Sequence, residues 1–221
     1  MYSFQSRATA AVLPPAFKED ELDERLSQKG VFRSDFLTPD LSAEVDVQAR
    51  ILATPTDAIV KGMFFEYLAR SARRFNVPCA PSYTAFRDYP MRDYMDLLYR
   101  YGRSRYPRLP VREAIRRVGW EAFPSLMESI AGRVIFAIAG RDIQAALKVT
   151  PKAYAHSIRP GQVEVAYLGE HQCVLELRNV WNFPDFYQVG TLEGGCRTFQ
   201  PGVQAWTRVH SLCNVDILLR W

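Results

Sequence analysis

The sequence has few cysteine and histidine side chains, the usual ligands of structural zinc. Its 221 residues include four cysteines and three histidines. No two cysteines form a Cys-x-x-Cys pair, so neither a disulfide framework nor the paired turns of a zinc site is indicated. His171 and Cys173 would share one face of a strand, but cysteine in a strand is usually a small buried apolar residue. We therefore expect no metal, no cofactor and a reducing compartment.

The sequence also lacks a long uninterrupted apolar run. The stretch from Ala10 to Leu13 is too short for the core of a signal peptide. The most apolar predicted helix, over residues 125–139, contains Glu128 and Arg133 and falls short of the roughly 20 apolar residues that cross a bilayer. We therefore expect a cytoplasmic protein with no membrane partner.

Neither sign of charge is in large excess. Lys and Arg number 28 against 24 for Asp and Glu, which gives a formal net charge of +4, and hydrophobic residues make up 48% of the chain. This balance permits an anionic partner without requiring one. The length and composition are those of one large globular domain or two small ones, which can bury a core without disulfides.

Recognisable catalytic motifs are missing as well. There is no Gly-x-Ser-x-Gly sequence, and the one histidine near the junction of the two halves, His156, has an ordinary serine neighbour. The glycines between Gly190 and Gly195 do not lead into a predicted helix, as a phosphate-binding loop would, and favour a turn or a bulge. We therefore assign no catalytic residue; an enzyme stays open but is less favoured than a binding protein.

Helical periodicity dominates the first part of the chain. Apolar residues recur at spacings of three and four over residues 55–74, and again after Pro90, which predicts two amphipathic helices. The first stripe includes Tyr67 and Ser71, and the second, which is expected to face the core, includes Tyr94 and Tyr101. A shorter helix over residues 111–118 is expected to end at Gly119. Pro124 is expected to begin the helix that extends to residue 139, and because this helix is apolar nearly all round it is predicted to be buried.

Alternation of apolar and polar residues replaces this pattern after Pro160. The alternating runs cover residues 163–167, 175–177, 186–192, 203–209 and 215–221. They predict an antiparallel meander of about five strands. The predicted fold class is therefore α+β, with N-terminal helices packed on a C-terminal antiparallel sheet. Residues 1–40 form an N-terminal segment whose structure the sequence leaves uncertain. Residues 41–221 are predicted to form a single domain, helical over 41–158 and sheet over 161–221.

Arginine and tyrosine are concentrated between Tyr83 and Arg117. This segment contains nine arginines and six tyrosines, a mixture typical of surfaces that bind single-stranded nucleic acid. However, Arg92, Asp96 and Arg100 follow one another at a spacing of four, which predicts ion pairs along one helix face. We favour the self-paired surface and keep an anion-binding surface as the alternative. The candidate residues of that alternative are Arg100, Arg103, Arg105 and Arg108.

Scattered motifs, mostly in the second half of the chain, carry a family resemblance. They are Tyr106-Pro107, Glu113-Ala114, Gly119, Gly132-Arg133, Gly190-x-Leu192-Glu193-Gly194, Asp216 and Trp221, with Gly30-Val31-Phe32 as a match near the N-terminus. On these residues the chain resembles a myxobacterial paralogous family of uncharacterised proteins. The resemblance covers roughly Tyr99 to Trp221, and it implies no activity and no catalytic residue.

The order of elements is similar to that of the haem-nitric-oxide-binding sensors and the 4-vinyl-reductase-like ligand domains. This resemblance implies a small ligand held between a helical layer and an antiparallel sheet. For the haem sensors it also implies a histidine on a helix ahead of the sheet and a Tyr-x-Ser-x-Arg motif. Tyr154, Ser157 and Arg159 are spaced one residue too far apart for that motif, and no histidine precedes His156. We therefore expect no haem.

The first functional hypothesis is a non-enzymatic sensor or adaptor. The apolar helix over residues 125–139 and the sheet would enclose a small apolar ligand, or simply a core. The candidate ligand-binding residues are Met127, Ile130, Phe136, Tyr167, Leu175 and Trp206. The output would be contact with a protein partner or a second copy of the chain. Trp181, Phe183 and Phe186 would serve this contact if they are exposed; the alternative is that they are packed in the core. The alternative is a nucleic-acid or anionic-ligand binder with steeply salt-dependent affinity, and nucleic acid is the less favoured partner.

Overall fold

Helices come first along the chain and a sheet comes last. The computed structural model describes residues 33–128 and 142–221, together with residues 24, 27 and 140. In chain order the elements are η1 (Arg33–Asp35), α2 (Val47–Ala53), β1 (Ile59–Lys61), α3 (Gly62–Arg73), β2 (Asp88–Pro90), α4 (Met91–Arg105), α5 (Val111–Glu128), α7 (Ile143–Ala155), β3 (Ile158–Arg159), β4 (Gln162–Leu168), β5 (Gln172–Arg178), η2 (Pro184–Gln188), α8 (Val189–Arg197), β6 (Gln204–Val209) and β7 (Val215–Arg220). The predicted α+β class is confirmed.

The main sheet is antiparallel and has the strand order β4-β5-β7-β6. In its last strand Val215, Ile217 and Leu219 face the core and are completely buried, as the alternating pattern predicts. A second, smaller antiparallel sheet has the order β2-β1-β3 and joins the start of α3 to the end of α7. Because β1 occupies residues 59–61, α3 begins at Gly62 and not near residue 55 as expected.

The predicted strand over residues 186–192 is wrong, so the main sheet has four strands where about five were expected. Residues 184–188 form the π-helix η2, and α8 follows directly. Residues 182–190 are all buried, so the sequence there has no polar face from which a helical or strand period could be read. The glycines assigned to a turn lie inside α8, where a Cβ added at Gly194 would lie 2.6 Å from the carbonyl oxygen of Trp120.

Helix α5 also differs from the prediction, because it does not end at Gly119. It continues through Pro124 to Glu128. A Cβ at Gly119 would collide with the backbone of η2 and α8, so this glycine allows close helix packing and does not cap a helix. The rest of the predicted apolar helix, residues 129–139, lies outside the described residues.

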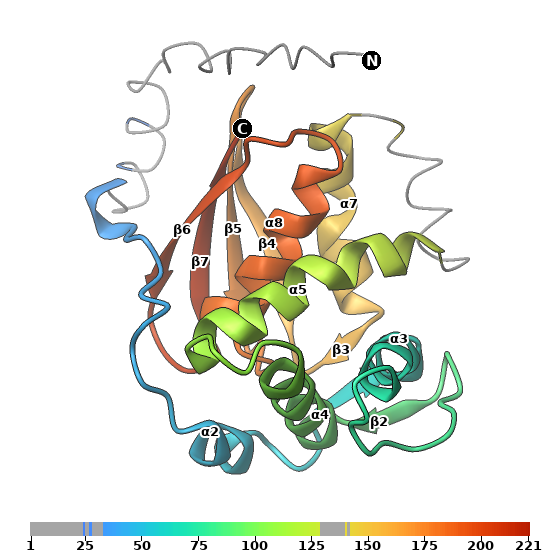
Figure 1. Cartoon of the computed structure of the whole chain (residues 1–221). Helices are drawn as coiled ribbons and strands as arrows, with labels where there is room; N and C mark the ends of the chain where they lie inside the picture. The colour runs from blue at the N-terminus through green and yellow to red at the C-terminus, as the bar shows by residue number, and fades with distance from the viewer. Residues whose placement is uncertain (1–23, 25–26, 28–32, 129–139, 141) are drawn as a thin grey trace, which may run out of the picture.

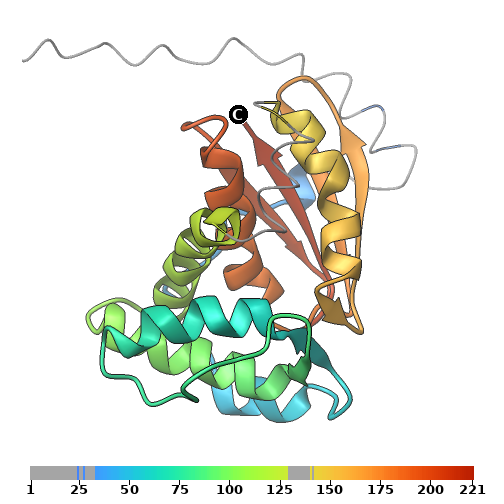
Figure 2. The same cartoon turned by 90° about the vertical axis from the view of Figure 1, so that its right-hand side faces the viewer.

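Helices α7 and α8 cover one face of the main sheet, and α8 lies between α5 and that sheet (Figures 1 and 2). Helices α3 and α4 pack beyond one end of the sheet. Side chains of the helices and the core face of the sheet belong to one continuous buried cluster. In the described part of the chain, no helix combines the length and the hydrophobicity needed to span a bilayer.

The opposite face of the main sheet carries a separate, smaller apolar cluster. Phe36 packs there against Tyr167, Val174 and Leu218. The next residue, Leu37, exchanges two backbone hydrogen bonds with Thr207 at the β6 edge of the sheet. The chain just before α2 therefore partly closes that edge.

Candidate functional site

A cleft of about 410 Å³ opens between α3, α4 and α5. Its lining residues are Tyr67, Ser71, Arg74, Phe75, Tyr101, Arg105 and Glu121. This volume is within the range of sites that hold small molecules. The lining combines aromatic rings with a few convergent charged and polar groups, which is the composition expected of a ligand site.

Helical spacing explains why these side chains meet. Tyr67, Ser71 and Arg74 follow one another at intervals of four and three, so they share one face of α3 and its last turn. Tyr101 and Arg105 are four apart on α4 and share the facing side of that helix. Glu121 reaches the cleft from the middle of α5.

The carboxylate of Glu121 organises one wall of the cleft. It accepts a hydrogen bond of 2.9 Å from the hydroxyl of Tyr101 and another from the hydroxyl of Tyr106. The Nε of Arg105 lies 3.7 Å from the same carboxylate, a loose ion pair. Burial and the adjacent Glu121 raise the pKa of Tyr101, and they raise the pKa of Tyr106 to about 12. Both hydroxyls are therefore protonated near neutral pH.

Two guanidinium groups lie in the cleft. Arg105 stacks on the rings of Phe75 and Tyr106, with its central carbon 4.8 and 5.2 Å from the ring centroids. Arg74 caps the C-terminal end of α3 and is exposed. Within the described part of the chain, the guanidinium of Arg74 makes no hydrogen bond or ion pair. The cleft therefore contains one cation in a loose ion pair and one available for a ligand.

A buried tyrosine pair lies behind the cleft. The hydroxyl groups of Tyr94 on α4 and Tyr187 on η2 are 2.7 Å apart. Burial and the neighbouring tyrosines raise the pKa of Tyr94, and burial raises the pKa of Tyr187 to about 12. Tyr67 in the cleft wall lies near enough to contribute to the raised pKa of Tyr94, Tyr187 and Tyr101. Tyr67 therefore belongs to the cleft wall and also acts electrostatically on the buried tyrosine pair.

A buried ion cluster holds η2 from the other side. Asp185 accepts two hydrogen bonds from Arg50 on α2, at 2.6 and 3.0 Å, and one of 2.8 Å from Arg112 on α5. The guanidinium carbons of the two arginines lie 5.2 and 5.1 Å from the centroid of the Phe186 ring. Because Asp185 is bound by arginines from two different helices, it joins η2 to both α2 and α5.

The backbone that enters η2 is strained. Phe183 has a φ of 52°, a left-handed conformation that bulky side chains rarely adopt. The buried Nε1 of Trp181 and Oδ1 of Asn182 have no hydrogen-bond partner among the described residues. Strain and unpaired polar groups of this kind persist only where surrounding contacts impose them, and π-helical turns are frequent at functional sites. This segment is therefore the best candidate for an element with two arrangements.

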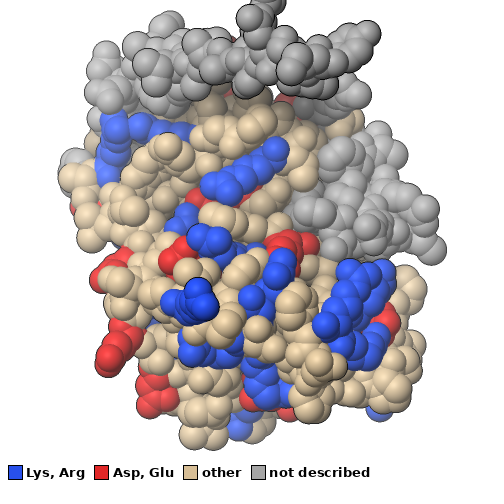
Figure 3. Space-filling model, in the orientation of Figure 1, with Lys and Arg blue, Asp and Glu red and all other residues tan. Residues whose placement is uncertain are grey.

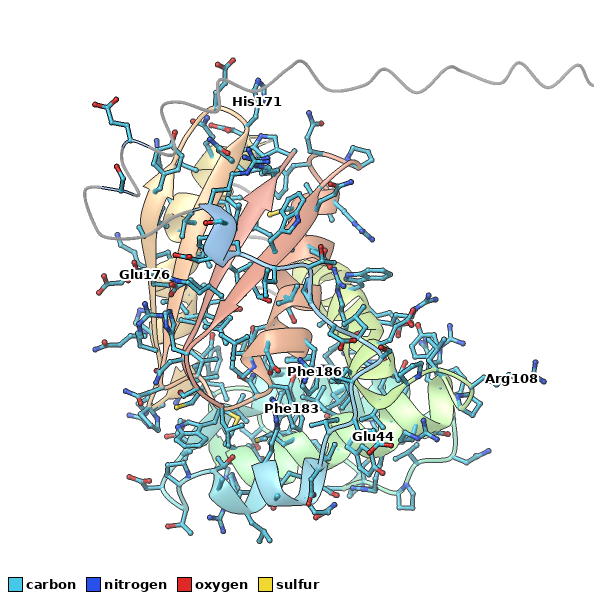
Figure 4. The ribbon with its side chains drawn as sticks, turned by 90° about the vertical axis from the view of Figure 1, so that its left-hand side faces the viewer. Glu44, Arg108, His171, Glu176, Phe183 and Phe186 are labelled. Carbon is cyan, nitrogen blue, oxygen red and sulfur yellow. The ribbon has the colours of Figure 1, made fainter. Side chains whose placement is uncertain are left out.

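The aromatics offered for a protein contact, Trp181, Phe183 and Phe186, are packed in or against the core, so the exposed alternative is wrong. Phe183 and Phe186 are completely buried between the sheet and the helices (Figure 4). Trp181 is half-buried and packs against the same core. The sequence left exposure open because a segment that is buried on all sides has no polar face, and so no period from which its buried side could be read.

The structure brings one of the four candidate anion-binding arginines to the cleft, namely Arg105. Arg100 donates to Asp96 and to the carbonyl oxygen of Pro78. Arg103 donates to the carbonyl oxygen of Leu109. Arg108 points away from the molecule (Figure 4). Of the four side chains, the cleft therefore includes Arg105 alone.

The candidate apolar ligand residues are also divided. Tyr167 and Trp206 lie at the small cluster on the outer face of the main sheet, whereas Leu175 is in the main core on the other face. Met127 is in α5, but its side chain is not among those described. Ile130 and Phe136 lie outside the described residues. The structure does not bring Tyr167 and Trp206 together with Leu175.

Three cleft residues on α3 and Glu121 on α5 were missed from the sequence. Tyr67 and Ser71 were placed on an apolar stripe, and this stripe was interpreted as facing a core. The signal that could have found the site is the polar end of this stripe, where Ser71 and then Arg74 replace apolar residues. Glu121 had no local signal, because its partners are 15 to 20 residues away on α4 and in the following turn.

Comparison with known proteins adds a family and a fold. The model of a family described as "Protein of unknown function (DUF2378)" matches residues 54–221, which include the cleft, η2 and the main sheet. No curated protein matches the chain. The resemblance to a family without an assigned activity is therefore confirmed, whereas a myxobacterial source stays a prediction.

Several solved structures of H-NOX proteins share the fold. The Fe(II) unliganded H-NOX protein from K. algicida is 12% identical with a TM-score of 0.50, and the match covers 72% of this chain and 95% of that chain. A mutant of the K. algicida protein is 13% identical with a TM-score of 0.53, covering 72% and 95%. A structure from work on heme distortion in the H-NOX family is 13% identical with a TM-score of 0.55, covering 73% and 94%. At such low identity the similarity shows the fold alone.

The histidines of this chain do not fit a haem held through histidine. His156 is exposed at the C-terminal end of α7. His171 is near Glu170 in the turn between β4 and β5, at 3.6 Å. His210 is exposed and its Nε2 lies 2.8 Å from Asp216. None of the three lines the cleft.

The residues compared with the Tyr-x-Ser-x-Arg motif do not converge either. Tyr154 is directed inward and donates a hydrogen bond to Gln188. Ser157 donates to the backbone of α7, and Arg159 is exposed and pairs with Asp88. These residues therefore do not fit a haem site of that kind.

Proposed function

Because the chain belongs to the DUF2378 family of proteins of unknown function and has an H-NOX-like fold, we propose that it is a ligand-binding sensor domain. The ligand would occupy the cleft between α3, α4 and α5, and the response would pass to η2, α8 and the main sheet. The observation that carries this proposal is the position of Tyr67, which lines the cleft and lies near enough to the Tyr94–Tyr187 pair to raise the pKa of both of its hydroxyl groups.

The coupling would depend on differential binding. A ligand shifts the packing of α4 on η2 only if it binds one arrangement more tightly than the other. Displacing the Tyr67 ring would change the surroundings of the buried Tyr94–Tyr187 hydrogen bond. Since η2 runs directly into α8, and α8 packs on the sheet, a shift there would reach the main sheet.

The state of the cleft tyrosines favours binding over proton transfer. The raised pKa of Tyr101 and Tyr106 keeps both hydroxyl groups protonated, with their protons directed at Glu121. A catalytic acid or base works best with a pKa near the working pH. Fixed donors of this kind instead hold the shape of a binding site.

Native mass spectrometry of the purified chain tests the binding step. We expect excess mass in the native spectrum that is absent after unfolding. The Ser71→Trp variant should lose this mass, because the indole fills the cleft, whereas Ser71→Ala should retain it. Two results together would contradict the proposal. The native spectrum would show the bare polypeptide mass, and protein freed of small molecules by unfolding, dialysis and refolding would have the same hydrogen-exchange rates in α3, α4 and α5 as the protein as purified.

The coupling step has its own test. Ligand binding should slow hydrogen exchange in the cleft helices and also in η2 and α8. In the Tyr94→Phe variant the slowing in the cleft helices should persist while that in η2 and α8 disappears, because the link to Tyr187 is removed. Tyr99→Phe on the same helix is the matched control, and its exchange should follow that of the wild type. Unchanged protection of η2 in Tyr94→Phe would contradict the coupling.

A further inference from the structure

We infer that the cleft accepts a small organic anion with a flat aromatic body, such as an aromatic carboxylate. This inference rests on the proposed function and names the chemical class of the ligand. It depends on the charges in the cleft, on which hydrogen-bond donors are already engaged, and on the ring surfaces that line the cavity.

The balance of charge in the cleft is positive. Two guanidinium groups, Arg74 and Arg105, face one carboxylate, that of Glu121, which leaves one positive charge. Glu121 already accepts hydrogen bonds from Tyr101 and Tyr106, and Arg105 lies beside it, so its charge is largely compensated inside the protein. The side chain that remains available to a ligand is therefore a cation, which favours an anion.

The hydrogen-bonding groups lead to the same conclusion. Arg74 has its full set of donors available, and the hydroxyl of Ser71, one turn earlier on α3, makes no hydrogen bond to the described residues. The planar guanidinium of arginine binds a carboxylate through two parallel hydrogen bonds. A carboxylate between these two side chains would be bound by charge and by geometry together.

The apolar part of the lining consists of rings. Tyr67 is on α3, Phe75 is in the turn after it and Tyr101 is on α4, and the Phe75 ring is already stacked on the guanidinium of Arg105. Flat aromatic molecules pack well against such surfaces, with ring centroids roughly 4.5–7 Å apart. A flat body attached to the anionic group would therefore be favoured over a branched aliphatic one.

The surface around the cleft would assist capture of an anion. Basic side chains gather over α3 (Figure 3). Arg70 and Arg73 lie in the last turn of α3, and Arg74 follows at its C-cap. Arg73 pairs with Glu66 at 3.4 Å, and exposure weakens this ion pair. A local excess of positive charge increases the rate at which anions arrive, and salt reduces the effect.

The test uses 2-naphthoate and its neutral amide, 2-naphthamide, which have the same flat body. Binding to the full-length chain is followed by saturation-transfer NMR and isothermal titration. We expect the carboxylate to bind about tenfold more tightly than the amide, with an affinity that falls as salt is raised. Because Arg74 is exposed, Arg74→Gln should weaken 2-naphthoate by roughly threefold to fivefold. Arg108→Gln, a matched loss of charge outside the cleft, should leave the affinity unchanged.

Three results would overturn the inference: equal binding of acid and amide, an unchanged affinity in Arg74→Gln, or no binding of either compound. The proposed function would fail separately, through a bare native mass with unchanged hydrogen exchange. If the native spectrum instead contained a neutral or cationic molecule that protects α3, α4 and α5, the sensor proposal would stand and the anionic class would be wrong.

Discussion

Replacing Asp185 with asparagine should strongly destabilise the protein. This carboxylate is 4% exposed and is bound by Arg50 and Arg112, each 14% exposed. Asparagine has nearly the same shape, so packing around η2 would be kept while the negative charge is lost. The two guanidinium groups would then lie close together in a poorly hydrated site with one neutral acceptor between them.

The expected loss follows from the burial of this cluster. Removing one partner of a buried ion pair costs about 3–5 kcal/mol, because the remaining charge is uncompensated. That is a large share of the roughly 5–15 kcal/mol by which a domain is usually stable. For a chain of this size the melting temperature should fall by on the order of 10 °C. Arg50→Gln in the same chain should recover part of the loss, since it removes one of the two stranded charges.

Urea denaturation followed by far-UV circular dichroism measures this loss. The matched control is Asp96→Asn, which breaks the exposed Arg100–Asp96 pair, whose side chains are 39% and 42% exposed. An exposed pair at this helical spacing contributes only about 0.3–0.5 kcal/mol. If Asp185→Asn and Asp96→Asn lowered the free energy of unfolding by similar amounts, the argument from burial would be refuted.

Two further predictions concern helix packing and acid stability. Gly194→Ala gains about 1 kcal/mol in helix propensity, but it puts a Cβ 2.6 Å from the carbonyl oxygen of Trp120. Such overpacking costs roughly 1–3 kcal/mol or more, so we expect a lower denaturation midpoint. In Gly102→Ala the added Cβ would lie 3.4 Å from Cγ1 of Ile115, an ordinary contact distance, so this variant should be neutral or stabilising. Burial by itself would raise the pKa of Asp216, but hydrogen bonds from His210 and two arginines outweigh it and lower the pKa below 3.8. The ionised Asp216 therefore stabilises the fold above about pH 4, and this contribution is lost as the pH falls through the lower folded pKa. Asp216→Asn should show a smaller loss of stability below about pH 4 in melting curves, and a steeper loss than in the wild type would contradict this sign.

Local periodicity predicted the amphipathic elements well. The stripe of α4 placed Tyr94 and Tyr101 toward the core, and both are 2% exposed. The spacing of four correctly predicted the ion pair of Asp96 with Arg100, whereas Arg92 donates instead to the carbonyl oxygens of Thr54 and Leu52. The alternation at the C-terminal end predicted β7. Each of these features depends on residues within one or two turns of each other, so the sequence contains all the information needed.

Prediction failed where burial is complete. Residues 186–192 were assigned to a strand, but the surrounding layers bury this segment on every side and it forms η2 and α8. Gly119 was interpreted as a helix end because a glycine after an apolar run often caps a helix. Its actual role depends on η2 and α8, which lie about 70 residues further along the chain and pack against it in three dimensions.

The sequence by itself determined the α+β class, the amphipathic helices α3 and α4, and the alternating strands, because each follows from a period that short-range geometry imposes. Only the tertiary structure decided that Tyr67, Arg74, Arg105 and Glu121 share a cleft, since three different helices supply them. It also decided that Asp185 is buried between arginines of α2 and α5, an arrangement set by long-range packing that leaves no period in the sequence.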